Sequence, residues 1–115
     1  MLRRLLALLC CLVVLLLVLW PQPAWADPGG RDGALLFSQH CAGCHINGGN
    51  IIRRSKTLKL AALQRNGIDG AAAIAAIASG GIGQMGGYGE VLGEGGPEAV
   101  AEWVWQQALT GWTKA

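Results

Sequence analysis

Basic residues are not in excess in the main part of this 115-residue chain. Residues 27–115 hold all seven acidic residues and seven of the nine lysines and arginines, so they carry no formal net charge. Binding to nucleic acid depends on a clear excess of basic groups that meet phosphates. The charge balance therefore argues against a nucleic-acid partner. The bases cluster within residues 53–65 and the acids within residues 90–102, which predicts a dipolar surface.

Alternating apolar and polar residues, which predict β-strands, are also missing, and no segment repeats. Helical spacing is present instead, so we predict an all-α fold with about four short helices. They are expected over residues 33–40, 57–67, 70–79 and from residue 96 onward. Residues 80–96 are rich in glycine and have no periodicity, so they are expected to form a long loop.

Residues typical of helix ends stand at the boundaries of these segments. Asp32, Thr57 and Asp69 precede three of the helices and are the predicted N-caps. Gly67 is expected to stop the second helix, and Pro97 suits the first position of the last one. The buried face of that last helix is expected to comprise Val100, Trp103, Val104 and Gln107 or Ala108.

The N-terminal segment has the pattern of an export signal. Two arginines are followed by an apolar run from Leu5 to Trp20 and by a small-x-small pattern that ends at Ala26. The run is shorter than the roughly 20 residues of a typical membrane span. We therefore predict that residues 1–26 are a cleaved signal peptide and that residues 27–115 form one domain. A retained membrane anchor is the alternative.

The predicted domain is small, with 89 of the 115 residues, and it contains all 18 glycines. A chain of this size buries a modest share of its surface, and each glycine loses much conformational freedom on folding. A bound cofactor that supplies part of the core would offset both effects.

This domain has no second pair of cysteines. Its only two form the pattern Cys41-Ala-Gly-Cys44-His45. A structural zinc site needs four ligands, usually from two such pairs, and a thioredoxin-like redox switch places its pair in a βαβ framework. Both are disfavoured, because the second pair and the strands are missing. A plain disulfide between the two cysteines remains the simplest alternative.

Covalent capture of haem fits the pattern best. Thioether bonds from Cys41 and Cys44 would anchor the porphyrin, and His45 is then placed to ligate the iron from one face. The second axial ligand is expected from Met85, the one methionine of residues 27–115. His40 is a competing ligand, but it stands too near the anchor to reach the opposite face easily. We expect His40 at the surface or at the haem edge.

Three segments carry a resemblance to a known family. Residues 32–45 resemble its first helix and haem anchor, and residues 48–67 match its run of Gly-Gly, Asn and Lys-Thr-Leu. Residues 101–112 match its terminal helix, which is usually closed by Gly-Trp. The family is that of the class I c-type cytochromes, and within it the chain resembles cytochrome c6 of cyanobacteria and algae. The resemblance covers essentially all of residues 27–115.

The resemblance implies a class I cytochrome c fold wrapped around one covalently bound haem c. Gly33 and Phe37 should pack against Trp103 and so join the first and last helices. At the haem edge, it implies a hydrogen bond from Asn50 and a propionate contact from Lys56 or Arg53.

The chain departs from the family at three places. Met85 is followed by Gly86 and Gly87, where the family usually has Pro-Ala, so the ligand loop should be floppier. Val91 stands where an arginine often lies on the docking side. Ile77 stands where photosynthetic members usually carry a glutamine beside the haem. These departures imply a divergent c6-like paralogue with a potential below that of a typical photosynthetic cytochrome c6.

The resemblance implies a soluble monohaem carrier of single electrons rather than an enzyme. Its implied partners are membrane redox complexes that it meets by transient docking, namely the cytochrome b6f complex and photosystem I or a terminal oxidase. The implied location is the thylakoid lumen or the periplasm, and the implied state is a monomer. The alternative is a haem peroxidase or small-gas sensor in which Met85 is a labile ligand.

Overall fold

The computed structural model describes residues 1–20 and 32–113 of the chain. The apolar N-terminal run forms helix α1, Leu2–Val18, which has no buried residue. Within the described residues no helix is both long and apolar enough to cross a bilayer. The predicted cleavage site after Ala26 lies outside these residues, so the boundary between residues 1–26 and 27–115 stays a prediction.

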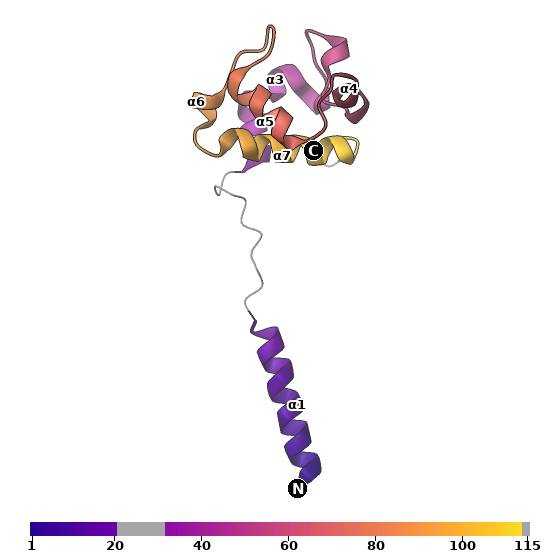
Figure 1. Cartoon of the computed structure of the whole chain (residues 1–115), viewed down its shortest axis with the longest axis vertical. Helices are drawn as coiled ribbons and strands as arrows, with labels where there is room; N and C mark the ends of the chain where they lie inside the picture. Colours follow the sequence, from indigo (N-terminus) through magenta and orange to yellow (C-terminus); the bar gives the residue numbers. More distant parts are fainter. Residues whose placement is uncertain (21–31, 114–115) are drawn as a thin grey trace.

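Residues 32–113 fold around the C-terminal helix α7, Gly96–Leu109. Helix α2, Gly33–His40, and helix α5, Ala71–Gly80, both pack against α7. Figure 1 shows α7 along one side of this domain, with α3, α5 and the loops between them on the other. The predicted all-α fold is confirmed, since the residues described contain no β-strand beyond an isolated bridge.

Short helical segments fill the connections, and several of them are not predicted by the sequence. They are α3, Ala42–His45; two 3₁₀ turns, Ile46–Gly48 and Arg54–Lys56; α4, Leu60–Arg65; and α6, Gly89–Leu92. The prediction of one unbroken loop over residues 80–96 was therefore wrong at α6. A single turn of helix has no visible apolar period, so only its tertiary contacts reveal it.

One of the three predicted N-caps is confirmed. The Asp32 carboxylate accepts hydrogen bonds from the backbone N–H groups of Ala34 and Leu35. Thr57 was predicted wrongly, because α4 starts only at Leu60 and its N-cap Lys59 makes no side-chain bond. The chain is still extended there.

The cap predicted at Asp69 was also wrong. Gly70 is the N-cap of α5, and no side chain caps that end. Gly67 does take a positive φ of 72°, as a helix-stopping glycine should.

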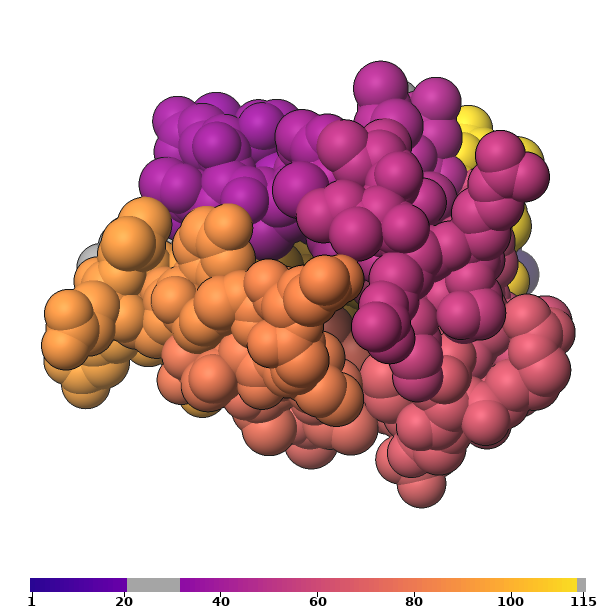
Figure 2. Space-filling model, turned by 90° about the horizontal axis from the view of Figure 1, so that it is seen from above, coloured from indigo at the N-terminus to yellow at the C-terminus, as the bar shows by residue number. Residues whose placement is uncertain are grey.

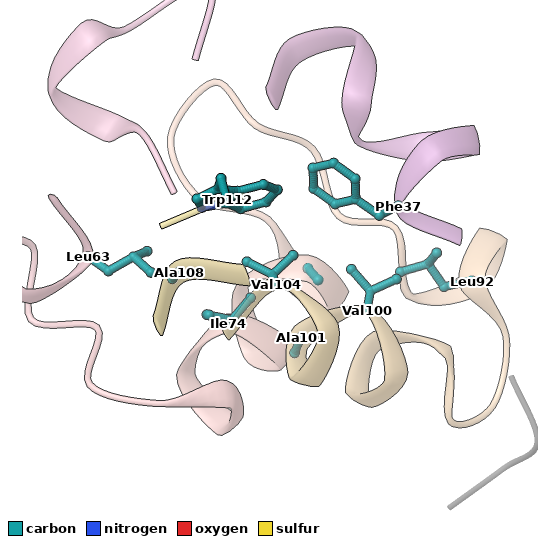
Figure 3. Close-up of a cluster of buried hydrophobic side chains, with 10 residues drawn as sticks. Phe37, Leu63, Ile74, Leu92, Val100, Ala101, Val104, Ala108 and Trp112 are labelled. Atoms are coloured by element: carbon teal, nitrogen blue, oxygen red, sulfur yellow. The ribbon is translucent and has the colours of Figure 1, made fainter. Parts of the chain in front are cut away.

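The apolar core lies between α7 and its neighbours, as Figure 3 shows. Its buried members are Phe37, Leu63, Ile74, Ala78, Leu92, Val100, Ala101, Val104, Ala108 and Trp112. The rings of Phe37 and Trp103 lie 4.8 Å apart between centroids, and the ring of Trp112 lies 5.5 Å from that of Phe37. Aromatic pairs at such distances stabilise a core beyond their buried area.

The contact of α2 with α7 depends on Gly33. A Cβ at this position would lie 2.2 Å from the backbone oxygen of Ala99 and 2.9 Å from the Cβ of Trp103. Only a residue without a side chain lets the two helices approach so closely. The predicted packing of Gly33 and Phe37 against Trp103 is thus confirmed.

Gly33→Ala should therefore lower the stability of the haem-loaded protein by roughly 1–3 kcal/mol, the usual cost of overpacking. Gly80→Ala is the matched control, because a Cβ there meets nothing within 4 Å. Gly80 ends a helix, so its replacement should be neutral or stabilising by up to about 1 kcal/mol. Guanidinium titration of both variants gives the comparison, and equal midpoints would contradict the close-packing argument.

Candidate haem site

His45 ends helix α3 and is buried, with 9% of its surface exposed. Its Nδ1–H donates a hydrogen bond of 2.8 Å to the backbone oxygen of Gly49. Asn47 and Gly48 take positive φ angles of 48° and 75°, which turn the chain back so that this oxygen faces the ring. A protonated Nδ1 leaves Nε2 as the nitrogen with a free lone pair, which is the form in which histidine binds a metal.

Cys41 and Cys44 stand on either side of the first turn of α3. Both are free thiols, with Cys41 half-buried and Cys44 exposed. Residues three apart on a helical turn face the same side. Burial raises the pKa of the Cys41 thiol, so this group is held in its neutral form beside the apolar core.

Met85 lies in a tight turn that follows α5. Its backbone exchanges two hydrogen bonds with Ile82, from Ile82 N–H to Met85 O at 2.9 Å and from Met85 N–H to Ile82 O at 3.0 Å. Tyr88 N–H then donates to Ala78 O at 2.8 Å, which ties the end of the turn to α5.

Glycines let this turn close on itself and pack on the backbone of α5. A Cβ on Gly81 would meet Met85 O at 2.5 Å, and one on Gly87 would meet Ser79 O at 2.6 Å. The floppier loop predicted from Gly86 and Gly87 stays a prediction, but Gly87 has a second role in the structure, since it permits close packing. Gly86 has open space around it.

These elements surround one cavity of about 740 Å³. Sites for small molecules and cofactors commonly span roughly 300–1,000 Å³. Figure 2 shows the surface hollowed between the segment of residues 80–95, in orange, and that of residues 40–57, in magenta. Cys41, Cys44, His45 and Met85 all line this cavity. The fold thus brings together the four site residues predicted from sequence, although Met85 is 40 positions beyond His45.

The walls of the cavity are mainly apolar. The apolar residues are Phe37, Ile52, Leu58, Leu63, Ile68, Ile74, Ile77, Ile82, Val100 and Val104, with several alanines of α5. His40 also lines it and is half-buried, in keeping with the predicted place at the edge of the cofactor. Ile77 faces the cavity, as the resemblance implied, while Val91 is exposed on α6.

A polar rim is built by the loop of residues 50–56. The Asn50 side-chain oxygen accepts from the N–H groups of Ile52 and Arg53, and its Nδ2 donates to Lys56 O at 3.0 Å. Asn50 thus holds the loop in shape, and Arg53 and Lys56 line the cavity beside it.

Asn66 also belongs to this rim, which the sequence analysis missed. It accepts a hydrogen bond from Lys56 Nζ and donates to the backbone oxygens of Ser55 and Ala62. These bonds tie the rim to α4. No short motif marks Asn66, because its bonds to Ser55 and Lys56 reach ten or eleven residues back along the chain.

The residues present fit a haem. An apolar cavity of cofactor size is bordered on one side by two thiols and a histidine with an available nitrogen, and on another by a thioether. By contrast, nowhere in residues 1–20 and 32–113 do three or more His, Cys, Asp or Glu side chains come together as a zinc ion would require.

Fold and site together define a c-type cytochrome, and comparison with known proteins supports this. A family model described as cytochrome C oxidase, cbb3-type, subunit III matches residues 28–104. The chain is 47% identical over 81 residues to a "Cytochrome c6-like" protein of Nostoc sp., covering 70% of this chain and 73% of the relative.

Solved structures give the same result. Cytochrome c6B of Synechococcus sp. WH8102 is 64% identical with a TM-score of 0.70, over 72% of this chain and 94% of that one. Cytochrome c6C of Synechococcus sp. PCC 7002 is 46% identical with a TM-score of 0.66, over 70% and 98%. The chain belongs to the cytochrome c6-like family. It has a class I cytochrome c fold and binds one covalent haem c, as predicted.

The packing of the Met85 turn predicts that substitution of Gly87 changes amide exchange at Tyr88 and that substitution of Gly86 does not. Gly87→Ala should push the turn away from Ser79 and weaken the bond from Tyr88 N–H to Ala78 O. Exchange of the Tyr88 amide hydrogen, followed by NMR, should then be about tenfold faster than in the parent. Gly86→Ala should leave it unchanged, since a Cβ there meets nothing. Equal exchange in both variants would be inconsistent with the close contact.

Proposed function

We propose that this cytochrome carries single electrons, with its haem held by thioethers from Cys41 and Cys44 and by the axial ligands His45 and Met85. The observation that carries the proposal is that these four side chains line one apolar cavity. The relatives named above, cytochromes c6B and c6C among them, support it. When bound, the haem supplies the iron centre that takes up and releases the electron.

The chain's own residues would make that exchange reversible. His45 and Met85 come from elements that are tied down by hydrogen bonds, so they would hold the haem with little movement as it gains or loses an electron. The apolar walls exclude water, and the Nδ1–H bond to Gly49 O fixes the orientation of His45. Arg53 and Lys56 at the rim would balance the charge of the haem propionates.

The bonds and packing that hold the turn of Met85 in place favour an electron carrier over an enzyme. A peroxidase or gas sensor needs an open sixth position and an acid–base group beside it. The turn that holds Met85 is bonded to Ile82 and packed on α5. The alternative therefore requires this turn to open.

The proposed partners and location are those that the resemblance to cytochrome c6 implies. Residues 1–26 would act as a cleaved export signal, and the mature monomer would work in the thylakoid lumen or the periplasm. It would dock transiently on membrane redox complexes, receiving electrons from the cytochrome b6f complex. Its acceptor would be photosystem I or a terminal oxidase.

Covalent attachment is the first expected outcome. The protein matured in a host that assembles c-type cytochromes should keep its haem through acid–acetone extraction. Cys41→Ala and Cys44→Ala should each leave at most one thioether, seen as a shifted band of the pyridine haemochrome. Free extraction from the parent protein would refute the proposed attachment.

Met85 should distinguish the carrier from the enzyme. The ferric protein should show the weak near-infrared band of methionine–iron ligation, and Met85→Ala should abolish it. The parent should bind carbon monoxide poorly, whereas the variant should bind it readily because its sixth position is open. Ready binding by the parent would support the sensor or peroxidase instead.

Ile77 should lower the potential of this protein relative to photosynthetic cytochromes c6. A glutamine amide near the iron can donate a hydrogen bond or orient its dipole in favour of the reduced state, and isoleucine offers neither. In a medium of low dielectric this dipole outweighs a small change in burial. Ile77→Gln should raise the potential by about 1–2 kcal/mol of redox free energy, roughly one hydrogen bond. Voltammetry of both forms measures it, and an unchanged value would count against the specialised role.

A further inference from the structure

The C-terminal Trp112 is held in an uncommon backbone conformation. Helix α7 ends in a Schellman motif, in which Gly111 has a φ of 72° and Trp112 N–H donates to Gln107 O at 2.8 Å. Trp112 itself takes a φ of 62°, although bulky residues rarely adopt positive values. Its side chain is buried and lies beside Phe37 in the core (Figure 3). Side-chain contacts must hold it there.

The indole of Trp112 lies directly on the turn that follows the haem-binding motif. A Cβ on Gly48 would fall 2.3 Å from the Cε2 atom of this ring. Trp112 Nε1–H donates to Leu58 O at 3.0 Å, and Leu58 N–H donates to Gly48 O at 2.8 Å. Trp112, Leu58 and Gly48 thus form a closed circuit of contacts.

Lys59 fastens the same turn from a second side. Its Nζ donates to Asn47 O at 2.7 Å and lies 5.8 Å from the centre of the Trp112 ring. Asn47 also has a positive φ, of 48°. The turn of residues 46–49 is therefore kept in its shape by groups that are distant in the sequence.

This turn carries the carbonyl that orients His45. Gly49 O accepts the bond from His45 Nδ1–H, and Gly49 is the neighbour of Gly48, on which Trp112 rests. We propose that Trp112, together with Leu58 and Lys59, is a positioning device that sets the strength of the His45–Gly49 hydrogen bond and through it the potential of the haem. This inference rests on the proposed role of His45 as an axial ligand.

The proposal predicts the sign of the change in haem potential. A strong bond from Nδ1–H makes an imidazole a better donor through Nε2, and a better donor favours ferric iron. Weakening the clamp should therefore raise the potential. Simple loosening of the fold would admit water, which favours the more charged ferric centre and lowers the potential. The sign of the shift separates a positioning role from a merely structural one.

Trp112→Phe is the test, because it keeps a ring over Gly48 and removes the bond to Leu58 O. Trp103→Phe is the matched control, since Trp103 packs in the same aromatic cluster against Phe37 and the Gly33 contact. In the ferrous holoprotein, exchange of the His45 Nδ1 hydrogen should be about fivefold faster in Trp112→Phe. Its potential should lie above that of Trp103→Phe.

A second variant tests the same proposal in case Trp112→Phe does not bind haem. Lys59→Met removes the bond to Asn47 O, and Arg65→Met is its control, since it removes an equal charge from an exposed site on α4. Loss of a positive charge by itself favours ferric iron and lowers the potential. Faster exchange at His45 in Lys59→Met, and not in Arg65→Met, is expected.

The outcomes separate the two levels of the argument. Equal exchange rates and potentials in each variant and its control would overturn the positioning role while leaving the carrier intact. A parent protein without covalent haem, or whose iron keeps its spectrum in His45→Ala, would instead overturn the proposed function.

Discussion

The contact of α2 with α7 is the constraint on which the rest of this structure depends. Gly33 lets the backbone of Ala99 come within the space a side chain would fill, and Phe37 then reaches Trp103 and the core. Because α2 ends at His40, its position also fixes where Cys41 and the following turn begin. The wall of the haem cavity is thereby tied to the C-terminal helix.

Glycine serves this protein in two physically distinct ways around the cavity. At Gly48 a positive φ and the close approach of the Trp112 ring both exclude a side chain. At Gly87 the backbone conformation is ordinary, and only the approach to Ser79 O excludes one. Both uses make a closely packed wall from a composition rich in glycine, and close packing suits a site whose ligands should stay in place as the charge changes.

The site also explains why a small domain can hold a large cofactor. One face of α5 packs on α7, while Ala73, Ala76 and Ile77 of α5 and part of the loop of residues 50–56 line the cavity. The apolar area that a larger domain buries within itself is here left for the haem, which fits the view that the cofactor completes the core. The polar rim at Asn50 and Asn66 keeps the opening in shape by bonds to the backbone.

The sequence alone determined the parts that depend on local chemistry. The spacing of Cys41, Cys44 and His45 indicates their role. Asp32 caps α2 by hydrogen bonds to residues two and three positions further on. The helical period of α7 predicts its buried face. The tertiary structure decided what depends on distant partners. Thr57 looks like a cap but is not one, because the neighbouring Leu58 is bonded to Gly48 and Trp112 and the chain there stays extended. Asp69 is not a cap either, since α5 begins after Gly70 and no side chain caps that end. The close packing of the Met85 turn and the clamp on the His45 turn were not visible in the sequence for the same reason. Gly87 meets Ser79, eight residues before it, and Gly48 meets Trp112, 64 residues after it, and no local pattern records such a contact.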